Sequence, residues 1–249
     1  MSVHLPLLRS DVPADPMADL DPVVLPAPTG PVPAAGPRAV AWAVLAVVLG
    51  YPDDATHACL DELSGTVDAV AAGLAPDVSR PLRRLLAGLR ATGPLAAQQH
   101  YVATIDTRRR SSLHLTYYLH GDTRRRGAAL WRLKASLAAC GVEPAGGELP
   151  DHLPVVLELA AVGDESVAVR LLEEHRAGLV LLQEALRRKG SPYADGVEAV
   201  LAMLPPRSGA DAACDLVAAG ELAAAGPPAE TVGLPSWTAP FRPSSGDPS

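Results

Sequence analysis

Glycine residues divide the middle of this sequence into stretches of helix length, and this spacing limits the fold more than any other feature. The stretches are rich in Ala, Leu, Arg and Glu, which favour helices, whereas only 4 % of the residues are aromatic and strand-favouring Ile and Phe are scarce. Short links between long helices are typical of one compact bundle, so the predicted fold class is all-α. The expected helices cover residues 39–49, 54–73, 77–91, 95–106, 109–120, 123–140, 151–162, 165–189 and 193–204, with breaks at Gly73, Gly93, Gly141, Gly163 and Gly190.

Proline marks both ends of the chain. Residues 1–37 contain nine prolines, which lack the amide hydrogen that helices and sheets need, and we expect a disordered arm there. Residues 205–249 are again rich in proline, with room for one short helix at 211–225. Beyond it, Trp237 and Phe241 would suit docking either onto the bundle or onto a partner. The chain is therefore predicted to consist of an arm (1–37), one helical domain (38–204) and a tail (205–249).

Neither a membrane span nor a metal site is expected. The apolar run 39–49 is well short of the ~20 residues needed to cross a bilayer, and the N-terminus lacks the pattern of a signal peptide. Cys59, Cys140 and Cys214 stand far apart, without a second cysteine or a histidine at metal-ligand spacing. Isolated cysteines fit a reducing compartment, so we expect a cytoplasmic protein.

Basic residues gather in one part of an acidic chain. Residues 80–134 hold twelve Arg and Lys side chains against Asp106 and Asp122, although the net charge of the whole chain is −7. Two arginine triplets, 108–110 and 124–126, flank the apolar run LHLTYYLHGD. This distribution predicts a bipolar surface that attracts an anionic ligand or an acidic partner. The alternative, that the arginines only solvate helix faces, stays open.

Local signals predict a tight corner between two helices. Gly121 should end the first helix in a left-handed conformation, and Asp122 or Thr123 should accept hydrogen bonds from the first amides of the next. Further along the chain, Asp151 directly follows Pro150 and is predicted to cap the N-terminus of the helix that contains VVLELAAV.

Two interpretations of the histidines remain open. His120 gains from the helix dipole at a helix C-terminus, or it joins Arg124 and Arg126 to hold a phosphate-like or pterin-like anion. Asp151 and His152 are either structural or part of a partner-binding surface. A catalytic pair is disfavoured, because neighbours at a helix start point in different directions and no third group completes a triad.

The search for chemistry is otherwise negative. The sequence has no GxGxxG, Walker or GxSxG motif, so no enzyme activity and no catalytic residue is predicted. Nucleic-acid binding is not expected either, because the chain is net acidic and has no recognised reader motif.

The most distinctive stretches are HGDxRxRGxA at residues 120–129 and ELPDHLP at residues 148–154. They are accompanied by LGYPD at 49–53 and YxxxID at 101–106, followed by Arg109, Ser112 and Leu113. Over residues 40–204 this set resembles the NarJ family. Its members are molybdenum-cofactor assembly chaperones, or delta subunits, of respiratory nitrate reductase, related more distantly to the TorD and DmsD redox-enzyme maturation proteins. Ile105 departs from the family pattern, in which an aromatic residue is usual before the aspartate, and both tails are diverged.

The resemblance implies a TorD-like bundle that binds the apo catalytic (alpha) subunit of nitrate reductase, in part through that subunit's N-terminal segment, and keeps it competent for molybdenum cofactor insertion. The cofactor would belong to the client, and none is expected here. Two rivals are a nucleotide- or pterin-binding protein that uses the arginines from Arg108 to Arg126, and a structural subunit that stays in the complex. We predict a positively charged, partly apolar groove near residues 101–154, with Tyr117, His120, Asp122, Arg124, Arg126, Asp151 and His152 as partner-binding residues.

Overall fold

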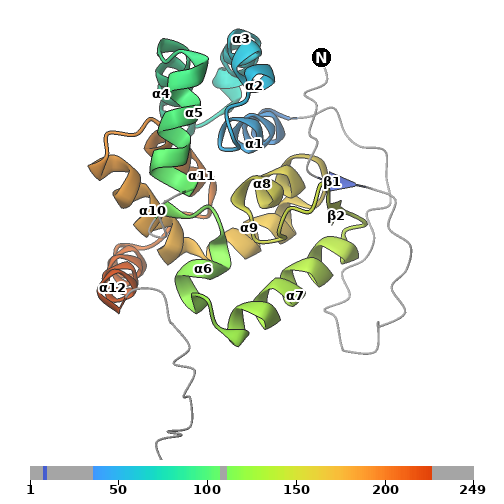
Figure 1. Cartoon of the computed structure of the whole chain (residues 1–249), viewed down its shortest axis with the longest axis vertical. Coiled ribbons are helices and arrows are strands. Elements are labelled where there is room, and N and C mark those ends of the chain that lie inside the picture. The colour runs from blue at the N-terminus through green and yellow to red at the C-terminus, as the bar shows by residue number, and fades with distance from the viewer. Residues whose placement is uncertain (1–7, 10–35, 107–110, 226–249) are drawn as a thin grey trace, which may run out of the picture.

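The computed structural model describes residues 8–9, 36–106 and 111–225, and it confirms the all-α prediction (Figure 1). No helix among the described residues combines the length and the apolar composition needed to cross a membrane. The helices are α1 (Pro37–Val48), α2 (Asp54–Ala58), α3 (Leu60–Val70), the 3₁₀ turn η1 (Ala71–Gly73), α4 (Pro76–Ala91), α5 (Pro94–Tyr101), the π-helix η2 (Val102–Asp106), α6 (Leu115–His120), α7 (Arg124–Ala139), α8 (Leu153–Val162), α9 (Glu165–Glu174), α10 (Arg176–Arg188), α11 (Tyr193–Met203) and α12 (Gly209–Ala225), and they are accompanied by the strands β1 (Leu8–Arg9) and β2 (Glu143–Pro144).

The core is built around α1 and α8, which pack against each other. α1 is buried nearly all round, as its apolar run predicts, and Trp42 and Leu45 are fully buried. Each fully buried side chain of this kind contributes about 1.5–3 kcal/mol through the hydrophobic effect. The indole N–H of Trp42 donates to Glu165 at 2.9 Å, which satisfies the polar atom of a buried residue. Figure 1 shows α2–α5 on one side of this pair and α6–α7 on the other.

Two predicted helices are each divided in two. The predicted helix 165–189 is interrupted at His175, whose ring nitrogen Nδ1 lies 2.8 Å from the carbonyl oxygen of Leu171. The predicted helix 54–73 is interrupted at Cys59, where φ is −92° and ψ is 0°. Neither position carries glycine or proline, so the sequence offers no local signal for these breaks.

The predicted helix 109–120 begins only at Leu115. His114, just before it, is extended (φ −85°, ψ 107°), because this part of the backbone pairs with residues 151–153. A contact between segments far apart in the sequence therefore overrides the local helical preference. Residues 107–110, which include the first arginine triplet, lie outside the described residues.

A short antiparallel strand pair joins the beginning of the chain to the loop before α8. β1 pairs with β2, with Leu8 opposite Pro144, and the amide of Leu8 donates to the carboxylate of Glu158 at 3.1 Å. The sequence predicted a disordered arm over 1–37. The structure differs from this prediction at Leu8 and Arg9, because they pair with β2, Leu8 packs against the core and its amide has a buried acceptor.

At the other end, α12 packs against α10 in the region predicted to be a tail with one short helix. Its Ala219 is buried. The predicted anchors Trp237 and Phe241 lie outside the described residues, as do the rest of 226–249 and residues 1–7 and 10–35.

The corner between α6 and α7 depends on Gly121. Its φ of 53° is positive, but its ψ of −145° lies outside the left-handed helical region that the sequence predicted, in a region essentially restricted to glycine. Thr123 occupies the N-cap position of α7, but its side chain accepts no hydrogen bond from a backbone amide of that helix. Its hydroxyl donates instead to the carbonyl of His120 at 2.7 Å, so this residue closes the end of α6.

We expect Gly121→Ala to lower the free energy of unfolding by about 1–3 kcal/mol, because a Cβ at this backbone conformation is strained. Gly127 inside α7 is the matched control, since a Cβ there meets no atom within 4 Å. Gly127→Ala should raise stability by about 0.5–1 kcal/mol. Urea unfolding of both variants checks this, and similar effects of both substitutions would contradict it.

Candidate partner-binding site

Two short stretches of backbone, residues 113–115 and 151–153, cross in antiparallel directions. The amide of Leu115 donates to the carbonyl of Asp151 at 2.9 Å, and the amide of Leu153 donates to the carbonyl of Leu113 at 2.9 Å. This pairing joins the start of α6 to the loop before α8, and the start of α8 to the loop before α6. The ELPDHLP stretch is thereby held against the stretch that precedes the HGD corner.

The carboxylate of Asp151 lies fully buried beneath this crossing. One oxygen accepts from both the amide and the hydroxyl of Thr116, and the other lies 3.1 Å from Nδ1 of His114. Asp151 therefore caps α6, which is distant in sequence, and the prediction that it caps α8 is wrong. Residue His152 stands at the N-cap of α8 and forms no side-chain cap there.

Hydrogen bonds keep Asp151 ionised. Burial alone raises the pKa of Asp151, but the hydrogen bonds from His114 and Thr116 and the nearby charge of Arg126 outweigh it and hold this pKa below its ordinary value. A buried charge with several donors is a stable arrangement, whereas the same charge without them would be costly.

Arg126 connects α7 to this buried carboxylate. Its guanidinium lies 3.6 Å from Asp151 and 3.7 Å from Asp122, and its Nε donates to the hydroxyl of Thr116 at 3.3 Å. The same group lies 5.8 Å from the centre of the Tyr117 ring. Its side chain is only 19 % exposed, so Arg126 is mainly a structural link between α6, α7 and the loop before α8.

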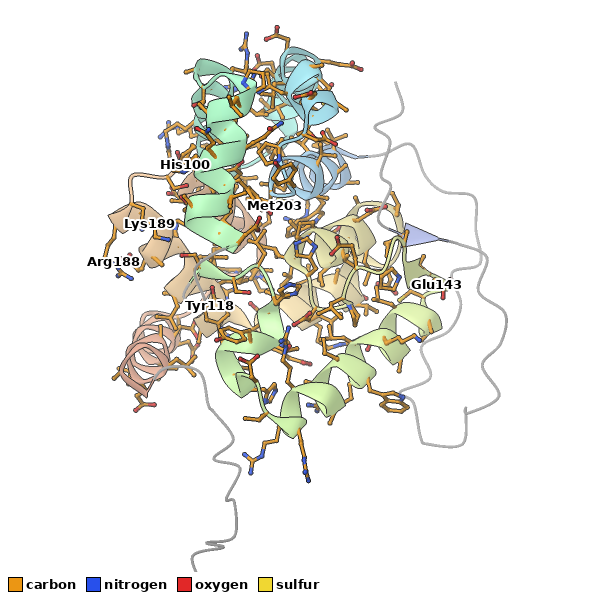
Figure 2. The ribbon with its side chains drawn as sticks, in the orientation of Figure 1. His100, Tyr118, Glu143, Arg188, Lys189 and Met203 are labelled. Carbon is orange, nitrogen blue, oxygen red and sulfur yellow. The ribbon has the colours of Figure 1, made fainter. Side chains whose placement is uncertain are left out.

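The two adjacent tyrosines of α6 have different environments. Tyr118 packs toward α10, where a Cβ on Gly178 would approach it to 3.0 Å, and its hydroxyl donates to the carbonyl of Ser112 (Figure 2). Tyr117 is 7 % exposed, and within the described residues its buried hydroxyl has no hydrogen-bond partner. An unsatisfied buried donor is rare, so the hydroxyl of Tyr117 needs an acceptor that the described residues do not supply.

Tyr117 lines a hollow of about 490 Å³ between η2, α6, α7 and the loop before α8. A second hollow of about 430 Å³ adjoins it, because four residues line both. We call the two together the acidic cleft. The first hollow is lined by Tyr101, Ile105, Asp106, Ser112, Leu113, His114, Tyr117, Asp122, Arg126 and His152, and the second by Ala46, Val47, Gly50, Tyr51, Asp53, Thr56, Tyr101, Asp106, His114, Glu148, His152 and Glu158.

Carboxylates outnumber cations in this cleft. Among the described residues it contains one guanidinium, that of Arg126, whereas its acids are Asp53, Asp106, Asp122, Glu148 and Glu158. Burial raises the pKa of Asp106. The acidic cleft is therefore not the positively charged groove predicted from the arginines.

The arginines of α4 explain much of this difference. Arg83 pairs with Asp68 at 2.7 Å, Arg84 with Asp195 at 2.7 Å, and Arg90 with an aspartate of α3. These charges are neutralised on the outer surface of α4 and do not reach the cleft.

His152 lies at the junction of the two hollows. Its Nδ1 is 3.1 Å from a carboxylate oxygen of Glu148 but without hydrogen-bond geometry, and its ring centre lies 5.3 Å from that of His114. Burial lowers the pKa of His152 to about 4, although Glu148 acts in the opposite direction. The imidazole is therefore neutral near pH 7.

The structure brings five of the seven predicted residues together and separates two. Those at the cleft or directly beneath it are Tyr117, Asp122, Arg126, Asp151 and His152. His120 lies at the end of α6 and lines a different hollow, and Arg124 is exposed in the first turn of α7. Sequence reasoning did not select Tyr101, Asp106 or His114 for the site. The first two belong to the YxxxID stretch, which was the signal available.

The described residues contain no cluster of three or more potential metal ligands among His, Cys, Asp and Glu. The three cysteines are free thiols; Cys59 and Cys140 are partly buried and Cys214 is exposed. Burial raises the pKa of Cys59 and of Cys140, so neither thiol is activated as a nucleophile.

Comparison with known proteins assigns the chain to a family. A family model described as nitrate reductase delta subunit matches residues 71–198, just over half of the chain. The chain belongs to the nitrate reductase delta-subunit family. Every residue lining the first hollow falls within the matched range, whereas the second hollow takes residues 46–56 from outside it.

Several curated proteins are similar to this delta-subunit family member. The nitrate reductase-like protein NarX of Mycobacterium tuberculosis is 39 % identical over 65 % of this chain and 24 % of its own length. The probable nitrate reductase molybdenum cofactor assembly chaperone NarJ of Bacillus subtilis is 29 % identical over 67 % of this chain and 89 % of its own. The nitrate reductase molybdenum cofactor assembly chaperone NarJ of Escherichia coli is 34 % identical over 61 % and 64 %. The chain thus spans about a quarter of the mycobacterial relative.

We expect Asp151→Ala to lower the free energy of unfolding by about 3–5 kcal/mol, because Thr116, His114 and Arg126 lose a shared buried acceptor. Asp164→Ala is the matched control. Asp164 caps α9 from the preceding residue at the surface, and its loss should cost about 1 kcal/mol. Guanidinium unfolding curves measure both free energies. Equal losses in the two variants would show that the buried cap by Asp151 stabilises the fold no more than an ordinary surface cap.

The folded protein should lose stability as the pH falls from about 6.5 to about 4. Between these values the unfolded chain binds a proton at His152 that the folded chain does not, since burial holds the folded pKa at about 4 against an ordinary 6.5. For this one group the loss between pH 7 and pH 5 is about 2 kcal/mol.

His152→Gln removes this titration while keeping a polar side chain. The difference between its unfolding free energies at pH 7 and pH 5 should be about 2 kcal/mol smaller than in the wild type. His57→Gln, on the partly exposed side of α2, serves as the control and should keep the wild-type difference. If the wild type and His152→Gln show the same pH dependence, the loss of stability does not come from protonation of His152.

Proposed function

We propose that this protein is an assembly chaperone for nitrate reductase, which binds the apo catalytic (alpha) subunit and keeps it competent for insertion of the molybdenum cofactor. Family membership supports this, as do the relatives named assembly chaperones in Bacillus subtilis and Escherichia coli. The observation that carries the proposal is the first hollow, which lies wholly within the family-matched region and holds the unpartnered Tyr117 hydroxyl.

The dimensions of the acidic cleft favour a short segment of the client over a folded surface. Hollows of about 490 Å³ and 430 Å³ each hold a few side chains, as ligand pockets do. We propose that the N-terminal segment of the alpha subunit lies in this cleft, as an amphipathic helix whose apolar side chains enter the hollows. The apolar contacts would come from residues such as Val47, Ile105 and Leu113.

The charges of the cleft indicate which segment it would prefer. Asp53, Asp106 and Glu148 line it, and they favour Lys or Arg beside the apolar anchors of the client. The carboxylate of Glu158 already accepts a hydrogen bond from the amide of Leu8, so it is only partly available to a client. The hydroxyl of Tyr117 would donate to a carbonyl oxygen of the bound segment, which gives the segment a fixed direction.

Binding of this kind suits a holding function. Contacts with a few side chains give moderate affinity, so the client is released once assembly proceeds. We place the activity in the cytoplasm, where free thiols such as those of Cys59 and Cys140 stay reduced. In this proposal the molybdenum cofactor is carried by the client and is not a resident group of the chaperone.

A nucleotide or pterin ligand is less well supported. Phosphate groups in the cleft would face its carboxylates, and Arg126 already lies between Asp122 and Asp151. Residues 108–110 lie outside the described residues. Calorimetry with GTP and with the molybdenum cofactor tests this rival directly. A structural subunit, in turn, would co-purify with mature, cofactor-loaded reductase, whereas a chaperone would not.

The cleft is tested by titrating a peptide of the alpha subunit's N-terminal segment into wild type and Tyr117→Phe. Removing one hydrogen bond of roughly 1 kcal/mol should weaken binding about fivefold. Tyr193→Phe is the matched control, because the buried hydroxyl of Tyr193 also has no hydrogen-bond partner in the described part of the chain, but Tyr193 does not line the cleft. Its affinity should equal that of the wild type.

Capture of the full apo alpha subunit by the same variants completes the test. If the wild type captures neither the subunit nor the peptide, the chaperone function is wrong. If it captures both and Tyr117→Phe binds as tightly as Tyr193→Phe, the function stands and the cleft is not where the peptide binds.

A further inference from the structure

A second groove lies on the other side of α6, between the end of α6, α7 and α9. Its hollow measures about 450 Å³, and no residue is shared with the acidic cleft. We call it the basic groove. It is lined by Leu119, His120, Ala129, Trp131, Arg132, Leu133, Ala135, Ser136, Ala139, Arg170, Leu171, Glu174 and His175.

The floor of the basic groove is apolar and made largely of small side chains. Ala129, Leu133 and Leu171 are buried beneath it, and Ala135 and Ala139 leave room for larger side chains of a partner. α7 has 16 residues and is therefore about 24 Å long, which is enough to accompany four turns of a second helix. The shape is that of a helix-binding groove.

Two large apolar side chains at this groove are exposed. Trp131 is 50 % exposed on α7, and Leu119 is 36 % exposed near the end of α6. Tryptophan is the residue type most often found at the energetic centre of protein interfaces, because it buries a large area with few rotatable bonds. An exposed tryptophan beside a preformed apolar groove indicates a partner that covers it.

The rim of the groove is positively charged. Arg132 and Arg170 lie on opposite sides, against the single acid Glu174, and neither guanidinium is within ion-pair distance of a carboxylate in the described part of the chain. Both are thus available to a partner, unlike the paired arginines of α4. The pKa of His120 is lowered by burial first and then by the positive charges around it, Arg132 among them, which agrees with a cationic rim.

We infer that the basic groove is a docking surface for an acidic amphipathic helix of a partner protein, with apolar side chains at i, i+3, i+4 and i+7 against α7 and with Asp or Glu opposite Arg132 and Arg170. Charge complementarity selects this occupant, because the rim is basic in a chain whose net charge is −7. The surface differs from the acidic cleft in position and in sign, so the two grooves take different segments. The inference does not depend on the proposed function.

The probe is a synthetic helical peptide of about 16 residues, matched to α7, with Leu at the apolar positions and Glu on its flanks. Its control has Lys in place of every Glu. Fluorescence anisotropy with the full-length protein should show binding of the Glu peptide and at least tenfold weaker binding of the Lys peptide. Equal affinity for the two peptides, or no binding of either, would overturn the inference.

Variants locate the binding. Trp131→Ala should weaken binding of the Glu peptide about tenfold or more. The double variant Arg132→Gln, Arg170→Gln should abolish the preference for Glu over Lys. Arg188→Glu is the control for net charge, since Arg188 lies at the outer end of α10 and does not line the groove (Figure 2). Tyr117→Phe should also bind normally. Wild-type affinity in Trp131→Ala would place the peptide elsewhere and refute the inference.

Two competing occupants give distinct results. If a second copy of the chain fills the groove, light scattering shows a dimer that Trp131→Ala dissociates. If the chain's own residues 10–35 fill it, replacing their four aspartates by asparagine increases the affinity for the Glu peptide, because that stretch has four Asp and no Lys or Arg. Either result would overturn the assignment to a partner protein.

Discussion

The buried carboxylate of Asp151 is the interaction on which the site depends, because three separate elements share it. The carboxylate accepts the Thr116 amide at the start of α6, where the N-cap residue His114 makes no side-chain cap. It also lies 3.6 Å from the guanidinium of Arg126 in α7. Burying such a charge is unfavourable unless donors surround it. Here the donors come from α6 and α7, so the charge is stable only when both helices are in place, and the position of Tyr117 follows from that requirement.

Charge is distributed differently from what the composition suggests. The arginines between residues 80 and 134 look like one basic region in the sequence, but Arg83, Arg84 and Arg90 of α4 form ion pairs with acids of α3 and α11. What remains is an acidic cleft on one side of α6 and a basic groove on the other. Two surfaces of opposite sign on one small bundle allow it to distinguish between partner segments.

Local patterns predicted the helices, and long-range contacts decided the site. The buried helix before Gly50 was predictable from its apolar run, and the corner at Gly121 from the glycine itself. The hydrogen-bond partner of Asp151 was not predictable, because Thr116 lies 35 residues away in the sequence and no local rule connects the two. The break at His175 was missed for a similar reason, because it has no glycine or proline. Tyr117 and His152 were both predicted to bind a partner, and the structure places them in one cleft.

The strand pairing of Leu8 has a practical consequence for anyone who purifies this protein. The amide of Leu8 donates to Glu158, which lines the acidic cleft. An affinity tag attached within seven residues of Leu8 begins at most about 25 Å from it, which is within reach of that cleft. A histidine tag, which becomes cationic in mild acid, would compete there for the carboxylates. α12 lies across the molecule from β1 (Figure 1), so a tag attached directly to the end of α12 starts on the opposite side of the molecule from Leu8.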